Sequence, residues 1–168
     1  MLREIKTNTH HYFVDENNLK QGEYKFYHEN GQLSIHTFYQ NGKCHGEFKS
    51  YYGNGQLWEH AFYLNNNLHG EYKRYHKNGL YIHTFYLNGK LHGEYKVYYC
   101  DGDLREHSSF QNDMRHGEHK TFFNNGKLKQ ATFYYQGINL HVDPDTLSEK
   151  DKTYIMMSGR LPPKEPSC

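Results

Sequence analysis

HGEYKRYHKNGLYIHTFYLNGK, residues 69–90, contains the pattern that decides the fold. Asn78-Gly79 separates two runs rich in tyrosine and other strand-forming residues, and Asn88-Gly89 follows the second run. Asn-Gly between such runs is a strong hairpin signal, because both residues tolerate positive φ. The stretch therefore predicts a strand, a turn, a second strand and a second turn.

The same sequence pattern recurs with a spacing of 23 or 24 residues, in units that begin at Gly22, Gly46, Gly70, Gly93 and Gly117. A second glycine follows nine residues after each of these, always preceded by Asn or Asp, at 30–31, 54–55, 78–79, 101–102 and 125–126. A second turn column also contains only residue types that tolerate a left-handed backbone, namely Gly42, Asn66, Gly89, Asp113 and Gly137. The pattern predicts an elongated, single-layer antiparallel β-meander of repeated hairpins.

The third unit is one residue shorter than the others, and the missing residue lies between Asn78-Gly79 and Leu80. A loss inside a strand would move every later side chain to the opposite face of the sheet. The following LYIHTFY nevertheless stays in phase with QLSIHTFY after Gly31. We therefore predict a two-residue loop in this unit and three-residue loops with a glycine bulge in the others.

The pattern divides the chain into an N-terminal half-repeat (1–21), five hairpin units (22–140) and a C-terminal helix with a mobile tail (141–168). About eleven strands are expected, in a sheet on the order of 50 Å long at roughly 4.7 Å per strand. Thr146-Leu-Ser-Glu149 resembles a capping box and predicts a helix over 145–158, ended by Gly159. This helix would cap the end of the sheet, or alternatively dock onto another protein. Its predicted apolar side consists of Leu147, Tyr154, Ile155 and Met156.

Composition limits the function classes. Apolar residues make up 35% of the chain and aromatic residues 17%, with 17 tyrosines and a single tryptophan. Such a chain suits a sheet covered by tyrosine rings better than a thick aliphatic core. The formal net charge is +1, from 20 basic and 19 acidic residues, so neither a nucleic-acid partner nor a membrane partner is expected.

Three scattered cysteines, Cys44, Cys100 and Cys168, do not form a disulfide framework and are expected to be free thiols. No apolar run approaches the roughly 20 residues of a membrane span. The N-terminus lacks the apolar centre of a signal peptide. The sequence predicts an intracellular protein of a reducing compartment.

The units HGEYKRYHKNG and LYIHTFYLNGK, with their copies over residues 22 to about 140, resemble the MORN-repeat variant. This variant occurs in bacterial antitoxin-like proteins of the YwqK type and in proteins of giant DNA viruses. The resemblance implies a scaffold, with a virion or infection-associated role and a location in the virion or the infected-cell cytoplasm. It also implies two alternatives, an antitoxin-like inhibitor of a toxic enzyme and a membrane-associated scaffold.

Two columns of histidines run through the units and supply the weak candidates for metal ligands, His36, His45, His60, His69, His83 and His92. Structural zinc sites usually have four tetrahedral ligands. Equivalent residues of successive units would lie about 9.5 Å apart, too far to share one ion. We therefore expect the histidines to be half-buried cross-strand residues, with no bound metal or other cofactor.

The sequence predicts a non-catalytic protein, because no base and orienting group stand once in an asymmetric pattern. A protein partner, of unknown identity, is expected, and self-association is compatible with this prediction. The binding candidates are Trp58, Arg74 and Tyr81, which lie in two columns that vary from unit to unit. Lone tryptophans and arginines are common interface anchors. Drift on an exposed face is the alternative explanation.

Overall fold

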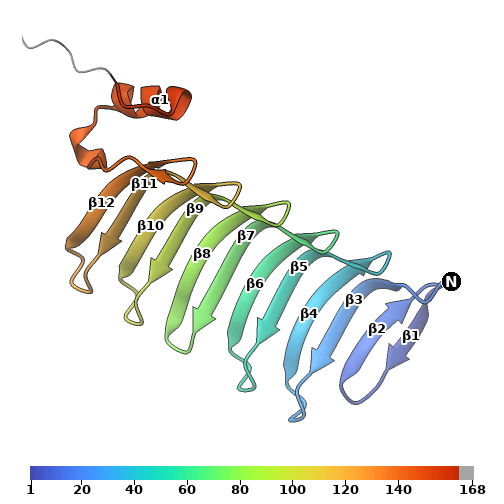
Figure 1. Cartoon of the computed structure of the whole chain (residues 1–168). Coiled ribbons are helices and arrows are strands. Elements are labelled where there is room, and N and C mark those ends of the chain that lie inside the picture. The colour runs from blue at the N-terminus through green and yellow to red at the C-terminus, as the bar shows by residue number, and fades with distance from the viewer. Residues whose placement is uncertain (163–168) are drawn as a thin grey trace, which may run out of the picture.

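The protein forms one open antiparallel sheet of 13 strands in sequence order, followed by a short helix (Figure 1). The computed structural model describes residues 1–162. The strands are β1 (Arg3–Lys6), β2 (His10–Val14), β3 (Lys20–Tyr27), β4 (Leu33–Gln40), β5 (Lys43–Tyr51), β6 (Leu57–Leu64), β7 (Asn67–His76), β8 (Gly79–Leu87), β9 (Lys90–Tyr98), β10 (Leu104–Gln111), β11 (Met114–Phe122), β12 (Leu128–Tyr135) and β13 (Ile138–Asn139). A 3-10 turn, η1 (Pro144–Thr146), and helix α1 (Glu149–Ser158) follow. The predicted all-β meander with a C-terminal capping helix is confirmed.

The hairpin loops at one rim have the predicted lengths. In the first unit, the His28 N–H donates to the Gln32 carbonyl, which leaves a loop of three residues that ends at Gly31. In the third unit, His76 pairs directly with Gly79, so that only Lys77 and Asn78 lie between them. The missing residue is thus absorbed in the loop, and the strands that follow keep their faces.

The turns at the other rim join each unit to the next. Asn41 and Gly42 both have positive φ, 51° and 74°, which matches the right-handed twist of a tight two-residue hairpin. The Gly42 N–H also donates to the Lys20 carbonyl of the preceding hairpin. The same inter-unit hydrogen bond recurs from Asn66 to Cys44, from Gly89 to Leu68, from Asp113 to Leu91 and from Gly137 to Arg115. These bonds fix the spacing of the units along the sheet.

The glycine of each His-Gly-Glu triplet marks a bulge. Gly46 has a φ of +94°, and the register between β4 and β5 shifts beside it, between Thr37 and Tyr39. The equivalent glycines, Gly70, Gly93 and Gly117, have φ values of +102°, +96° and +100°. Only glycine adopts this backbone readily, which explains its place in every unit.

Three details differ from the sequence predictions. The sheet has 13 strands instead of about eleven, because β1 pairs with β2 at the N-terminus and β13 pairs with β12 at the other end. Helix α1 begins at Glu149 instead of 145, because Pro144 starts a separate 3-10 turn. The capping box uses Ser148 and Asp151 in place of Thr146 and Glu149. Gly159 ends the helix as predicted, with a φ of 71°.

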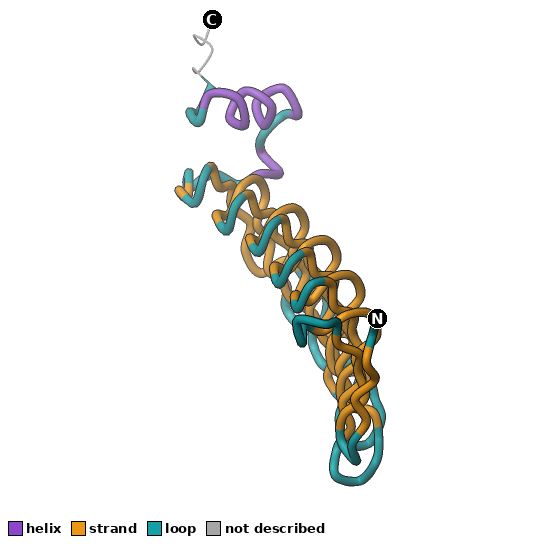
Figure 2. Tube along the Cα trace, turned by 90° about the vertical axis from the view of Figure 1, so that its right-hand side faces the viewer, coloured by secondary structure: helices purple, strands orange, loops and turns teal. Residues whose placement is uncertain are grey.

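The sheet is a thin, twisted column of strands when seen from the side, with α1 at its C-terminal end (Figure 2). A single layer has no enclosed core, so the buried residues lie mostly under side chains of one face. Thr37, Ala61, Thr84 and Ser108 are at most 2% exposed, and each lies at the same position in its unit. The cross-strand partners of these small residues all have rings, which lie on the same face of the sheet and cover them. The partners are Tyr24, Phe48, Tyr72, Tyr95 and His119.

Candidate protein-interaction surface

One face of the sheet has a glutamate, a lysine and a histidine in contact in most repeats, and we term this face the charged face. In the second unit, Glu47 Oε1 lies 2.7 Å from Lys49 Nζ and 2.9 Å from His60 Nε2. Lys49 and His60 are direct cross-strand partners, and Glu47 shares their face because it lies two residues from Lys49. The charged face consists of Glu23, Lys25, His36, Glu47, Lys49, His60, Glu71, Lys73, His83, Glu94, Lys96, His107, Glu118 and Lys120.

The charged face satisfies its own charges. The hydrogen bond from Lys49, with a second from His60, holds the pKa of the Glu47 carboxyl below its usual range. The same arrangement lowers the pKa of Glu23, of Glu71 and of Glu94. Each of these carboxylates joins a lysine and a histidine of the same hairpin, so these groups act as cross-strand stabilisers.

The histidine columns have separate environments. The Nε2 atoms of His36, His60 and His83 lie 2.8 to 2.9 Å from glutamate oxygens of their own hairpins. His69 Nδ1 instead lies 3.2 Å from Asn88 Oδ1, while His45 Nδ1 and His92 Nδ1 are buried without a hydrogen-bond partner in residues 1–162. Across these residues, no three or more His, Cys, Asp or Glu side chains gather around a point.

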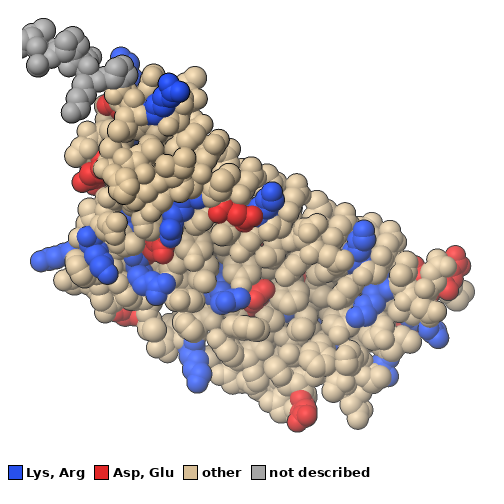
Figure 3. All heavy atoms as spheres, in the orientation of Figure 1, with Lys and Arg blue, Asp and Glu red and all other residues tan. Residues whose placement is uncertain are grey.

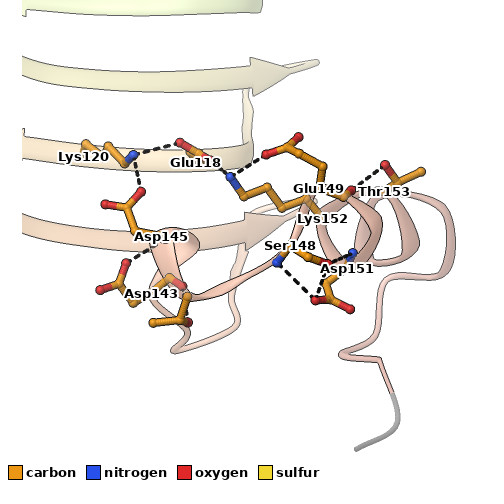
Figure 4. A network of polar contacts seen from close by, with 10 residues as sticks. Glu118, Lys120, Asp143, Asp145, Ser148, Glu149, Asp151, Lys152 and Thr153 are labelled. Atoms are coloured by element: carbon orange, nitrogen blue, oxygen red, sulfur yellow. Dashed lines mark hydrogen bonds and ion pairs between the residues drawn. The ribbon is translucent and has the colours of Figure 1, made fainter. Parts of the chain in front are cut away.

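The fifth unit breaks the ionic pattern because α1 covers it. Ala131 replaces the histidine, and Lys152 of α1 supplies the missing donor, with its Nζ 2.6 Å from Glu118 Oε1 (Figure 4). Lys120 Nζ lies 2.7 Å from Oδ1 of Asp145, the middle residue of η1. Burial raises the pKa of the Glu118 carboxyl, but the hydrogen bonds from Lys152 and Lys120 outweigh it and leave the pKa lowered.

Helix α1 places one stripe of residues against the sheet. Lys152, Ile155 and Gly159 are spaced i, i+3 and i+7, so they share a side of the helix. Ile155 is 0% exposed, and a Cβ on Gly159 would lie 2.6 Å from Tyr135 Cε1. Phe133, the cross-strand partner of Glu118, is 2% exposed. Of the predicted apolar side of α1, only Ile155 is buried, whereas Tyr154 and Met156 face solvent.

The opposite face has one ring pair in each unit, and we term it the aromatic face. The pairs are edge-to-face, with centroids 5.4 to 5.8 Å apart, a geometry that aromatic rings favour. They are Tyr24–Tyr39, Phe48–Tyr63, Tyr72–Tyr86, Tyr95–Phe110 and His119–Tyr134. This regular lattice is the structural reason for the tyrosine-rich composition.

Two of the three predicted binding residues meet on the aromatic face. The Arg74 guanidinium lies 5.7 Å from the centre of the Trp58 ring, close enough for a cation–π contact. Trp58 is 42% exposed, and the Tyr52 ring lies 6.2 Å from it. Tyr81 belongs to the next unit, where it contacts His76 and Arg105 instead. We term Tyr52, Trp58, Glu59 and Arg74 the Trp58 patch.

A hollow of about 390 Å³ lies beside Trp58. Its lining includes Ile35, Phe48, Tyr52 and the two serines Ser34 and Ser50. Sequence reasoning singled out Trp58 but missed the serines, although both stand in the variable columns that suggested the patch. Small residues in those columns are the signal that could have located the hollow.

Charges of both signs are mixed on the face of the molecule that Figure 3 shows. Figure 3 shows lysines, arginines and acidic residues scattered over the face turned to the viewer, without a large area of one sign. Within residues 1–162, helix α1 is too short and too polar to cross a membrane.

The open sheet, with its short hairpins at a spacing of 23 or 24 residues and its C-terminal capping helix, defines a β-hairpin repeat protein. The MORN repeat variant matches residues 20–43, 45–65, 91–112 and 115–136, which together make up just over half of the chain. The chain therefore belongs to this repeat family. MORN repeats suggest a repeat scaffold, and they often mediate protein or membrane interactions.

No curated protein matches the chain. One solved structure with a match is the crystal structure of TarM, at 11% sequence identity and a TM-score of 0.27. The match covers 67% of this chain and 21% of TarM, so this chain spans about a fifth of that protein. A TM-score this low carries no argument about fold or function.

Proposed function

We propose that this protein is a non-catalytic repeat scaffold that binds another protein through the Trp58 patch of its aromatic face. The observation that carries the proposal is an exposed tryptophan stacked by an arginine beside an apolar hollow, on a face that is otherwise a regular lattice. Exposed aromatic and arginine anchors next to a pocket are typical of interface hot spots. The side chains of the charged face instead pair with one another in the same way from unit to unit.

The test begins with capture of the tagged chain from its native setting and identification of the proteins that stay bound. A stoichiometric partner is then purified, and the complex is rebuilt from the two pure components. We expect Trp58→Ala and Arg74→Ala to weaken the rebuilt complex by at least tenfold, as hot-spot losses above about 1.4 kcal/mol do. Lys49→Ala, in the same part of the sheet but on the charged face, is the matched control and should leave affinity unchanged.

Equal affinity of the Trp58 and Arg74 variants and the wild-type chain would overturn the assignment of the patch. A virion role, antitoxin-like inhibition and membrane association rest on the family resemblance alone and stay predictions. The identity of the captured protein separates the first two, since a capsid protein and a toxic enzyme are different outcomes of the capture, and flotation of the chain with lipid vesicles tests the third.

A further inference from the structure

The hollow beside Trp58 arises where two variable columns both have a serine. One column consists of Ser34, Trp58, Tyr81, Arg105 and Lys129, and the other of Phe26, Ser50, Arg74, Val97 and Thr121. Ser34 and Ser50 lie on neighbouring strands β4 and β5, where Ser50 is the cross-strand partner of Ile35. Larger side chains occupy most equivalent positions, so the two serines leave the space of about 390 Å³ open.

The hydroxyl of Ser50 is buried in this hollow without a partner. Ser50 is 5% exposed, and its Oγ makes no hydrogen bond to any of residues 1–162. Burying an unpaired hydroxyl is unfavourable, and most buried polar groups in proteins have a partner. The Oγ itself has almost no exposed surface, so a ligand that brings one hydrogen-bonding atom to the bottom of the hollow would pair with it after a turn of the Ser50 side chain about χ1.

The walls suit a flat apolar group. The lining includes the rings of Phe48, Tyr51, Tyr52, Trp58 and His28 and the aliphatic side chain of Ile35. Rings on this face already meet edge-to-face at centroid distances of 5.4 to 5.8 Å, so one more ring continues the same packing. The volume falls within the range of about 300 to 1,000 Å³ that is common for ligand pockets.

The charge of the lining favours a neutral polar tip. The Glu59 side chain lies in the lining and is 13% exposed, and its Oε2 lies 3.2 Å from the Tyr72 hydroxyl and 3.7 Å from Arg74. Its charge is thus compensated at one side, and an anionic group that entered the hollow would approach this carboxylate, whereas His28, the other ionisable side chain of the lining, has its Nε2 3.0 Å from the Tyr51 carbonyl oxygen. A phenol has the required ring and a neutral hydroxyl, whereas a phosphorylated phenol adds a repelled charge.

We propose that the hollow binds the side chain of a tyrosine presented by the partner protein, with the phenol hydroxyl hydrogen-bonded to Ser50 Oγ. The inference rests on the proposed function, because the hollow lies beside the Trp58 patch. It deepens that function by naming the chemistry recognised, an unphosphorylated tyrosine.

The test uses p-cresol, the free side chain of tyrosine, as the probe. Trp58 is the only tryptophan of the chain and lines the hollow, so its fluorescence reports occupancy directly. We expect a saturable change of emission with p-cresol. Binding of toluene, which lacks the hydroxyl, should be about tenfold weaker, as one lost hydrogen bond predicts. The phosphate ester of p-cresol should also bind more weakly than p-cresol.

Two variants locate the binding. Ser50→Phe places in the second unit the ring that Phe26 has in the first, so it should fill the hollow and abolish the response. Thr121→Phe, the same column in the fifth unit, is the matched control and should leave binding unchanged. Ser50→Ala keeps the space but removes the hydroxyl, so p-cresol should bind about tenfold more weakly and toluene as before. This second variant keeps the test decisive should Ser50→Phe not fold.

Absence of a saturable response to p-cresol, or an equal response in Ser50→Ala and the wild-type chain, would overturn the inference. The inference and the proposed function fail separately. Loss of a rebuilt complex in Trp58→Ala but not in Ser50→Phe would retain the patch and reject the hollow. If p-cresol binds but the capture experiment finds no protein partner, the scaffold is rejected. A partner's tyrosine is then rejected as the occupant of the hollow as well.

Discussion

Lys152 Nζ lies 2.6 Å from Glu118 Oε1, so an amine of helix α1 takes the hydrogen-bonding place that a histidine holds in the four preceding units. The helix is therefore attached through the repeat's own ionic pattern, with Ile155 as its apolar anchor.

We expect Ile155→Ala to weaken docking of α1 by roughly 2–5 kcal/mol, the usual loss for a large-to-small change in a buried site. Lys152→Ala should cost at most about 1 kcal/mol, because the Glu118 side chain is 36% exposed and solvent screens the pair. Hydrogen exchange of the amides of residues 149–158 measures both effects. Lys150→Ala, an exposed neighbour, is the control, and faster exchange in this variant would contradict the assignment.

Ala131→His restores the histidine that the other units have at this position. The imidazole would compete with Lys152 for Glu118 in the space below α1, so we expect the helix to undock, at a cost of roughly 1–3 kcal/mol. Hydrogen exchange should accelerate in α1 while β9 and β10 keep their protection. The reverse change in an uncovered unit, His60→Ala, should leave α1 unaffected. Unchanged exchange in α1 after Ala131→His would show that the helix does not need the small residue.

The hairpins could be predicted from the sequence because turn chemistry is local. Asn78-Gly79 and Asn88-Gly89 each predict a turn from the local sequence alone. The shortened third unit also predicts a two-residue loop, which the structure has. The single layer follows from the same pattern, since each unit pairs only with its neighbours.

The start of the helix and the hollow depend on more distant relations. Thr146-Leu-Ser-Glu149 resembles a capping box, but Pro144 commits the residues after it to a 3-10 turn, and Ser148 caps the helix instead. The hollow requires knowledge that Ser34 and Ser50 become neighbours across β4 and β5. Register is uncertain in the sequence because the bulges shift it, so the candidate site could be predicted only as far as Trp58 and Arg74.

The bulge glycines provide a test of backbone strain. Gly70→Ala places a side chain at a φ of +102°, which L residues rarely adopt, and we expect a loss of at least about 1–2 kcal/mol in the free energy of unfolding. Gly53 is the matched control, because its φ is not in the left-handed region and a Cβ there would meet no atom within 4 Å. Gly53→Ala should be neutral or stabilise by up to about 1 kcal/mol. Denaturant unfolding of both variants decides between them.

The carboxylates of the charged face make the free energy of unfolding fall as pH falls in the acid range. Hydrogen bonds, first from the neighbouring lysine, lower the pKa of Glu23, Glu47 and Glu71 below the ordinary value of 4.5. Such carboxylates stabilise the fold above pH 4.5, and the contribution is lost as pH falls through their folded pKa values. We expect the free energy of unfolding to drop below pH 4.5 and Glu47→Gln to reduce that slope. An unchanged slope in Glu47→Gln would contradict the assigned role of the ion pairs.

The tyrosines of the aromatic face make the free energy of unfolding fall as pH rises in the alkaline range. Burial, followed by the nearby Glu59 carboxylate, raises the pKa of Tyr63 and of Tyr72 to about 12, from an ordinary value of 10.0. The unfolded chain loses these phenol protons first, so the stabilisation is complete below pH 10 and is lost as pH rises from 10 toward about 12. Tyrosinate absorbance should show a late-titrating fraction in the folded chain that is absent in denaturant. Tyr72→Phe should shrink that fraction and flatten the fall in stability above pH 10, whereas an identical titration in this variant would show that the buried ring pairs do not resist ionisation.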